Sequence, residues 1–222
     1  MIVDFLAISF IGISVLSFVL FYIGTNKDKT ILMFFSFWTV VVGTLSYVGF
    51  FKNTTLTPPR MLVVILPTVL YTIYFIRKME IKKMRINYLL AIHILRLPVE
   101  LTLYELFLKG EIPVVMTFKG WNFDVFIGVS ALLLLLYKLI SKKGINKTIF
   151  LLWNYVGLVF LMIIVMTAIF ALPSPIQQLA FDQPNKAILE FPYTLLPGLV
   201  VPIVFLSHVF CLKIIRVEMG KF

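Results

Sequence analysis

Residues 86–108, INYLLAIHILRLPVELTLYELFL, combine an apolar run with ionisable residues near its centre. Most of this stretch is apolar enough to lie in a lipid bilayer, and its length suits a membrane-spanning helix of about 20 residues. Three ionisable residues nevertheless lie near its centre, namely His93, Arg96 and Glu100, and Pro98 lies between the last two. Charges at that depth are costly, so we expect them either to serve a function or to pair with each other.

The composition indicates a membrane protein. Of the 222 residues, 61% are hydrophobic and 14% are charged, whereas a soluble domain has about 25% charged residues. Long apolar runs alternate with short basic segments, which predicts one integral membrane domain over 1–222. The net charge of +10 does not indicate nucleic-acid binding, because the basic residues cluster at the ends of the apolar runs. The single cysteine, Cys211, excludes an internal disulfide.

Seven apolar runs are long enough to span a bilayer, so we expect an all-α bundle of seven transmembrane helices. The first run lacks the basic region and the cleavage site of a signal peptide, and we expect it to be retained as a helix. The runs cover about 3–24, 31–51, 61–76, 86–108, 123–140, 148–172 and 192–213.

The distribution of Lys and Arg predicts the orientation of this bundle. The links after the first, third and fifth runs share a side with the C-terminus, and that side holds most of the 20 basic residues. By the positive-inside rule this side is cytoplasmic, which leaves the N-terminus outside. Its basic residues are Lys27, Lys29, Arg77, Lys78, Lys82, Lys83, Arg85, Lys138, Lys142, Lys143, Lys147, Lys213, Arg216 and Lys221. We expect a multi-pass cell-membrane protein of the bacterial inner-membrane type, with lipid as its surroundings and anionic head groups at its basic face.

The ionisable residues of 86–108 share one side of a helix. At 100° per residue, His93, Arg96, Glu100 and Tyr104 lie on one stripe. Arg96 and Glu100 are four residues apart and therefore close enough to pair, and Pro98 removes a backbone hydrogen bond beside them. The stripe predicts either a site for a substrate, ion or proton, or an internal ion pair that only packs this helix.

Two further polar residues are expected at the depth of His93. At 1.5 Å per residue from the centre of each run, His93, Asn154 and His208 lie about 6 to 9 Å toward the cytoplasm. This shared depth predicts that three helices bring them together, as a proton relay or, with Glu100, as a metal site. We do not expect a metal, because the sequence has no HxxxH or ExxH pair and lone histidines usually hydrogen-bond to a neighbour.

The run at 192–213 is interrupted by Pro197, Gly198 and Pro202 in its outer half. Such broken helices line cavities in transporters, although a simple bend in an inert bundle is an equal alternative. No lysine lies within this run, so a retinal Schiff base has no candidate, and we expect no cofactor.

The polar residues before the run at 123–140 allow two interpretations. Asn122 can cap that helix, and Asp124 suits its first turn, where the positive end of the helix dipole favours a carboxylate. Alternatively, both residues fold over the outer mouth of the site on 86–108. Together with Asp182 they form the predicted outer vestibule.

Two segments resemble parts of uncharacterised bacterial multi-pass membrane proteins, namely 116–125, MTFKGWNFDV, and 191–210, FPYTLLPGLVVPIVFLSHVF. This resemblance implies no known activity. We expect a small secondary carrier or channel for an ion, proton or polar solute. The alternatives, in order, are an accessory subunit of a membrane complex and a membrane-embedded enzyme that acts on a lipid or quinone-like substrate. The sequence leaves both a homo-oligomer and a complex with a partner protein open.

Overall fold

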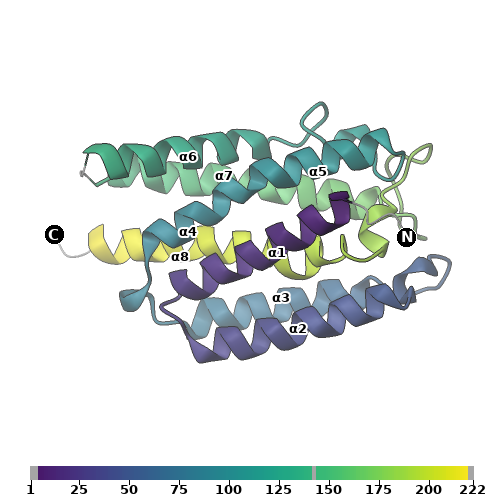
Figure 1. The fold of residues 1–222 in the computed structure, drawn as a ribbon, viewed down its shortest axis with the longest axis horizontal. Helices are drawn as coiled ribbons and strands as arrows, with labels where there is room; N and C mark the ends of the chain where they lie inside the picture. The colour runs from purple at the N-terminus through teal and green to yellow at the C-terminus, as the bar shows by residue number, and fades with distance from the viewer. Residues whose placement is uncertain (1–4, 142–143, 220–222) are drawn as a thin grey trace.

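The computed structural model of the protein describes residues 5–141 and 144–219. Its long helices run along roughly one common direction (Figure 1). The described part of the chain contains no strand, so the expected all-α fold is confirmed. The α-helices are α1 Phe5–Gly24, α2 Lys29–Tyr47, α3 Leu62–Lys78, α4 Ile86–Ile92, α5 Arg96–Leu108, α6 Asp124–Ser141, α7 Lys147–Phe170 and α8 Val201–Met219. The shorter helical segments are η1 Phe50–Lys52, η2 Ile81–Lys83, η3 His93–Leu95, η4 Val114–Met116, η5 Ala187–Leu189 and η6 Leu196–Val200.

Six helical stretches in the described residues are long and apolar enough to cross a membrane. They are α1, α2, the continuous stretch α4–η3–α5, α6, α7, and η6 joined to α8. The seventh expected span corresponds to α3, a helix of 17 residues that contains Pro67 and ends in Arg77 and Lys78. At 1.5 Å per residue it is about 26 Å long, which is close to the shortest length that crosses the hydrocarbon core.

Most predicted helix boundaries agree with the structure to within a few residues, and the differences have local causes. The helix expected at 31–51 begins at Lys29, because Asp28 caps it by accepting hydrogen bonds from the backbone N–H groups of Thr30 and Ile31 at 2.8 and 3.1 Å. It ends at Tyr47, just before Gly49 turns the chain with a φ of +72°. The α8 helix runs on past 213, because Ile214 and Ile215 are buried against the rest of the bundle.

Some residues of the predictions lie outside the described residues. These are residues 3 and 4 of the first predicted run and the basic residues Lys142, Lys143 and Lys221.

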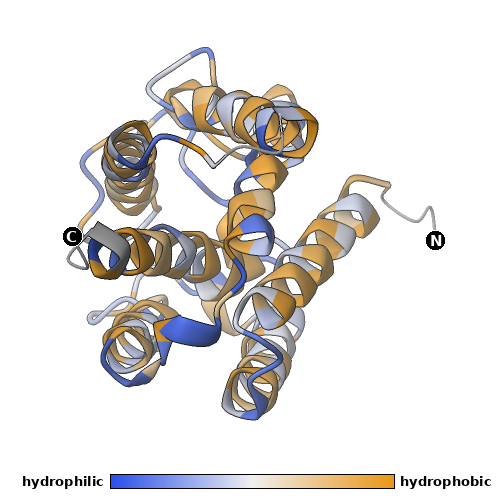
Figure 2. Ribbon diagram, turned by 90° about the vertical axis from the view of Figure 1, so that its left-hand side faces the viewer, coloured by the Kyte–Doolittle hydropathy of each residue, from blue (hydrophilic) through white to orange (hydrophobic). Residues whose placement is uncertain are grey.

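The α8 helix lies at the centre of the bundle and contacts α7, α3, α4 and α1. Of its most apolar stretch, 78% is buried, compared with 22% for α2 and α6. The outer helices therefore turn long rows of large apolar side chains outward, as helices in lipid do. Figure 2 shows these apolar residues along the helices and the hydrophilic residues mainly at the ends and in the loops.

The stretch at 86–108 is one bent rod. It consists of α4 and α5 joined by the 3₁₀ turn η3, which begins at His93. The bend precedes Pro98, whose ring cannot donate a backbone hydrogen bond and crowds the preceding turn. In Figure 1 this rod crosses the bundle obliquely, from the end that holds the C-terminus toward the opposite end.

Candidate functional site

A buried ion pair joins the bent rod to the start of α6. The Arg96 Nη1 atom donates a hydrogen bond to Asp124 Oδ1 at 2.9 Å, and the two side chains are only 3% and 9% exposed. The two helices approach closely because Gly128 faces Leu97, where a Cβ atom on the glycine would lie 2.8 Å from the leucine Cγ. Asp124 is the first residue of α6, so the helix dipole also favours its carboxylate.

A second pair forms beside the first. Asn122 Nδ2 donates to Glu100 Oε1 at 2.5 Å and to the backbone carbonyl of Met116 at 3.1 Å. Asn122 Oδ1 accepts from the backbone N–H of Asp124 at 3.1 Å. Asn122 therefore caps α6 and also binds Glu100 on α5.

The structure brings the two histidines and Asn154 together. His208 Nδ1 lies 2.9 Å from Asn154 Oδ1, and His208 Nε2 lies 3.3 Å from Arg96 Nη2. Asn154 Nδ2 already donates to the Phe150 carbonyl at 2.7 Å, which leaves its Oδ1 as an acceptor. Because Arg96 can only donate, His208 is assigned as the neutral tautomer with its proton on Nδ1.

His93 completes the cluster by stacking rather than by hydrogen bonding. Its ring lies 3.8 Å from that of His208, with an angle of 26° between the planes. Trp153 packs edge-on against His93 at 5.2 Å, and its indole Nε1 donates to Ser130 Oγ at 2.8 Å. Within the described part of the protein, neither ring nitrogen of His93 has a hydrogen-bond partner.

We call these seven residues the central network. All are buried, with exposed fractions between 0% and 6%. They are His93, Arg96, Glu100, Asn122, Asp124, Asn154 and His208.

Several expectations about this region need correction. Arg96 forms its ion pair with Asp124 rather than with Glu100, whose Oε1 binds Asn122 instead. Asn122 and Asp124 do not form an open outer vestibule, since both are buried in the central network. Asp182 is exposed in the loop that follows α7 and takes no part in it.

Tyr104 also lies outside the central network. Its hydroxyl accepts a hydrogen bond from Lys119 Nζ at 2.5 Å, and its ring packs against Phe118 at 4.9 Å. It therefore ties α5 to the loop before α6.

Gly157 is a residue of the site that the sequence analysis did not single out. A Cβ atom at this position would lie 2.4 Å from His208 Cε1, so only glycine lets α7 and α8 approach here. Its carbonyl also lies 3.5 Å from Arg96 Nη2. A glycine inside the apolar run of α7, three residues after Asn154, is the signal that indicates such an approach.

The broken start of α8 has a structural explanation. Leu196–Val200 form a π-helical turn, and the Gly198 carbonyl that this turn exposes accepts hydrogen bonds from Trp38 Nε1 and Tyr71 Oη, both at 3.0 Å. The break thus connects α8 to α2 and α3, and the carbonyl is not directed toward the central network.

An apolar cavity of about 370 Å³ lies between α3, α7 and the start of α8. Partly exposed residues such as Val69 and Met162 line it, so it reaches the side of the bundle, where the helices present their exposed apolar residues. Leu103 and Met116 also line it. Leu103 lies one turn after Glu100, and the Met116 carbonyl binds Asn122, so the cavity comes close to the central network.

Residues 57–216, which include the whole central network, match a family model described as a domain of unknown function, DUF8737. The chain belongs to this family. The part that defines DUF8737 begins before α3 and ends within α8, so α1 and α2 precede it. No curated protein and no solved structure matches the chain.

The side chains of the central network are of types that can exchange protons and bind charged groups. Carboxyl and imidazole groups both take up and release protons. In the described residues, no group of three or more His, Cys, Asp or Glu side chains is arranged to hold a metal ion.

Proposed function

We propose that the protein is a small integral membrane carrier or channel that takes up a proton, a cation or a small polar solute at Glu100. The observation that carries this proposal is the charge balance of the central network. Asp124 compensates Arg96 directly, whereas the hydrogen bond of Glu100 goes to the neutral amide of Asn122. An ionised carboxylate without a counter-charge is very costly in a membrane interior, so Glu100 needs a proton or a bound positive group.

Unpaired polar atoms at the same place support this proposal. Among the described residues, Glu100 Oε2, Arg96 Nε and both ring nitrogens of His93 are buried without a hydrogen-bond partner in the protein. A network that only packed the helices would satisfy its own polar groups, because each unpaired buried group costs about 1–3 kcal/mol. Spare donors and acceptors favour a site that exchanges a ligand or a proton.

The proposed topology has seven spans, with α3 as the shortest, and an outside N-terminus. Its support is the collection of Lys and Arg at one end of the bundle, where α3, α6 and α8 end. Cysteines introduced at Lys52 and Lys29, at opposite ends of α2, test this orientation. An impermeant maleimide should label Lys52→Cys and not Lys29→Cys in intact cells, and the opposite pattern would reverse the topology.

Transport assays in proteoliposomes test the function. With a potential set by potassium and valinomycin, internal pH- or sodium-sensitive dyes report proton or cation entry. Glu100→Gln should abolish the flux, because the amide can neither release a proton nor compensate a cation. Glu105→Gln is the matched control, since Glu105 is an exposed glutamate on the same helix. Equal flux through both variants would refute the role of Glu100, and wild-type flux no greater than that of empty liposomes would favour an accessory subunit.

A membrane-embedded enzyme that acts on a lipid or quinone-like substrate is the second candidate. The apolar cavity favours this enzyme, because the cavity opens on the side of the bundle and extends to Leu103 and Met116, beside the central network. His93, His208 or Glu100 would then act as acid or base. A change in cellular lipids or quinones that depends on the protein and disappears with Glu100→Gln would favour this candidate over the carrier.

A further inference from the structure

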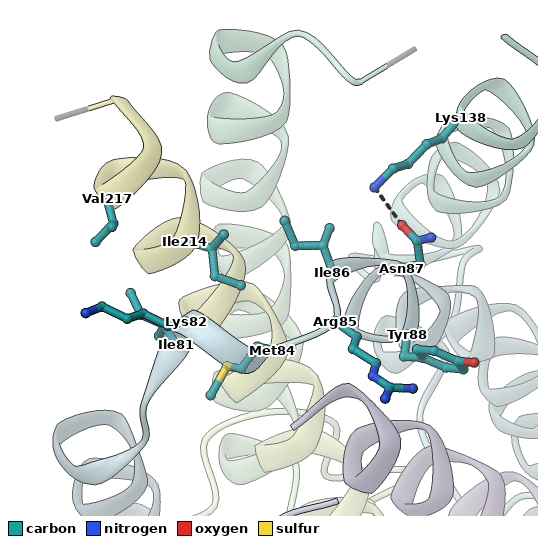
Figure 3. Close-up of a pocket in the computed structure, with 10 residues that line it drawn as sticks. All are labelled: Ile81, Lys82, Met84, Arg85, Ile86, Asn87, Tyr88, Lys138, Ile214 and Val217. Atoms are coloured by element: carbon teal, nitrogen blue, oxygen red, sulfur yellow. Dashed lines mark hydrogen bonds between the residues drawn. The ribbon is translucent and has the colours of Figure 1, made fainter. Parts of the chain in front are cut away.

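A second pocket of about 590 Å³ lies at the basic end of the bundle, and no residue of the central network lines it (Figure 3). It is bounded by the segment from η2 to the first turn of α4, by the last turn of α6 and by the end of α8. A hydrogen bond of 2.8 Å from the Arg85 backbone N–H to the Gly24 carbonyl holds this segment against the end of α1. We call it the basic-end pocket.

Three cationic side chains line the basic-end pocket, namely Lys82, Arg85 and Lys138. No Asp or Glu is among its lining residues. The ion pairs of the described residues, Lys52–Glu190 and Arg96–Asp124, lie elsewhere. Lys138 Nζ donates to Asn87 Oδ1 at 2.6 Å, so its neighbour orients it without neutralising it. The pocket therefore has a surplus of positive charge.

The other side chains of the pocket are largely apolar. In Figure 3, Ile86 and Ile214 lie between Lys82 on one side and the Asn87–Lys138 pair on the other, and Val217 extends the apolar surface along α8. Ile86 opens α4, and Ile214 belongs to the buried face of α8. Charge and apolar surface thus meet where membrane-spanning helices end.

We propose that the basic-end pocket binds an anionic phospholipid. The cations Lys82, Arg85 and Lys138, spread around the pocket, attract its head group, and one acyl chain lies along Ile86, Ile214 and Val217. The position fits, because lipid head groups lie at the ends of spans and basic pockets between helices suit them. The apolar half of the pocket favours a lipid over a free anion, since a free phosphate has no surface to bury there. This site is independent of the proposed transport at Glu100.

Lipid binding can be measured on the purified chain in nanodiscs of phosphatidylcholine that contain a small fraction of phosphatidylglycerol. Native mass spectrometry counts the phosphatidylglycerol molecules that stay bound. The wild type should prefer phosphatidylglycerol, and the triple variant Lys82→Gln, Arg85→Gln and Lys138→Gln should weaken that binding by on the order of 10-fold or more.

A control variant with the same loss of charge separates a specific site from general attraction. Lys27→Gln, Lys29→Gln and Arg77→Gln remove three exposed cations at the same end but outside the pocket. This control should keep its preference within about twofold of the wild type. An equal loss in both triple variants would overturn the proposal in favour of diffuse attraction, as would a wild type without preference.

Two further measurements keep the test decisive. Competition by inorganic phosphate or glycerol phosphate as effective as by the intact lipid would show a free-anion site and would overturn the proposal. If the pocket triple variant does not fold, the double variant Lys82→Gln and Arg85→Gln replaces it, because neither side chain makes a hydrogen bond or ion pair to the described residues. Unchanged lipid preference in this double variant would overturn the proposal too.

Discussion

Substitution of Gly157 by alanine tests the packing that holds the central network together. The new Cβ atom would lie 2.4 Å from His208 Cε1 and 2.5 Å from Nε2, closer than side chains tolerate. His208 has no room to move, because it stacks on His93 at 3.8 Å and lies 2.9 Å from Asn154 Oδ1. We therefore expect α7 and α8 to separate at this point.

The expected cost of Gly157→Ala follows from three contributions. Overpacking a buried site costs about 1–3 kcal/mol. Separation of the helices also breaks the 3.3 Å contact between Arg96 Nη2 and His208 Nε2. The buried polar groups that lose their partner cost about 1–3 kcal/mol. Alanine favours the helix more than glycine does, and this higher helix propensity offsets up to about 1 kcal/mol of the loss. Together these contributions should lower the free energy of unfolding by about 1–5 kcal/mol.

Unfolding of the purified protein in mixed micelles, titrated with a denaturing detergent, measures this loss. Fluorescence reports on the site directly, because Trp153 lies 5.3 Å from the His208 ring. Gly12→Ala is the matched control, since no atom lies within 4 Å of a Cβ built at this helical glycine. The control should be neutral or stabilised by about 0.5–1 kcal/mol. Equal stability of the two variants would refute the described approach of α7 and α8.

Two further substitutions can be measured in the same way. Asp124→Asn removes the partner of the buried Arg96 guanidinium, and we expect the free energy of unfolding to fall by about 3 kcal/mol. Its control is Lys52→Gln in an exposed ion pair, which should lower the free energy of unfolding by less than about 1 kcal/mol. Similar losses in the two variants would contradict a buried ion pair. Trp38→Phe removes one donor to the Gly198 carbonyl, which keeps a second donor from α3, so about 1 kcal/mol is expected. An unchanged stability would show that the second donor alone is sufficient.

The helices were predictable because they depend on local properties. Apolar run length sets where a helix crosses a bilayer, and a fixed rise per residue converts sequence position into depth. That arithmetic predicted a shared level for His93, Asn154 and His208, and helix packing decided that they touch. Helix ends were less accurate where a capping residue such as Asp28 began a helix earlier, or where buried residues such as Ile214 continued it past the predicted end.

Residues 86–108 show the limit of such arithmetic. Spacing along the stretch correctly put Arg96 and Glu100 on one stripe, but it could not tell which residues of other segments would reach them. Asp124 and Asn122 reach them because the loop before α6 folds inward and Gly128 lets α6 approach. In the same way, the carbonyl exposed at Gly198 is occupied by Trp38 and Tyr71, which lie far away in sequence. Helical periodicity fixes neighbours within one helix, whereas partners between helices depend on rotation, close approach and loop path, which only tertiary packing sets.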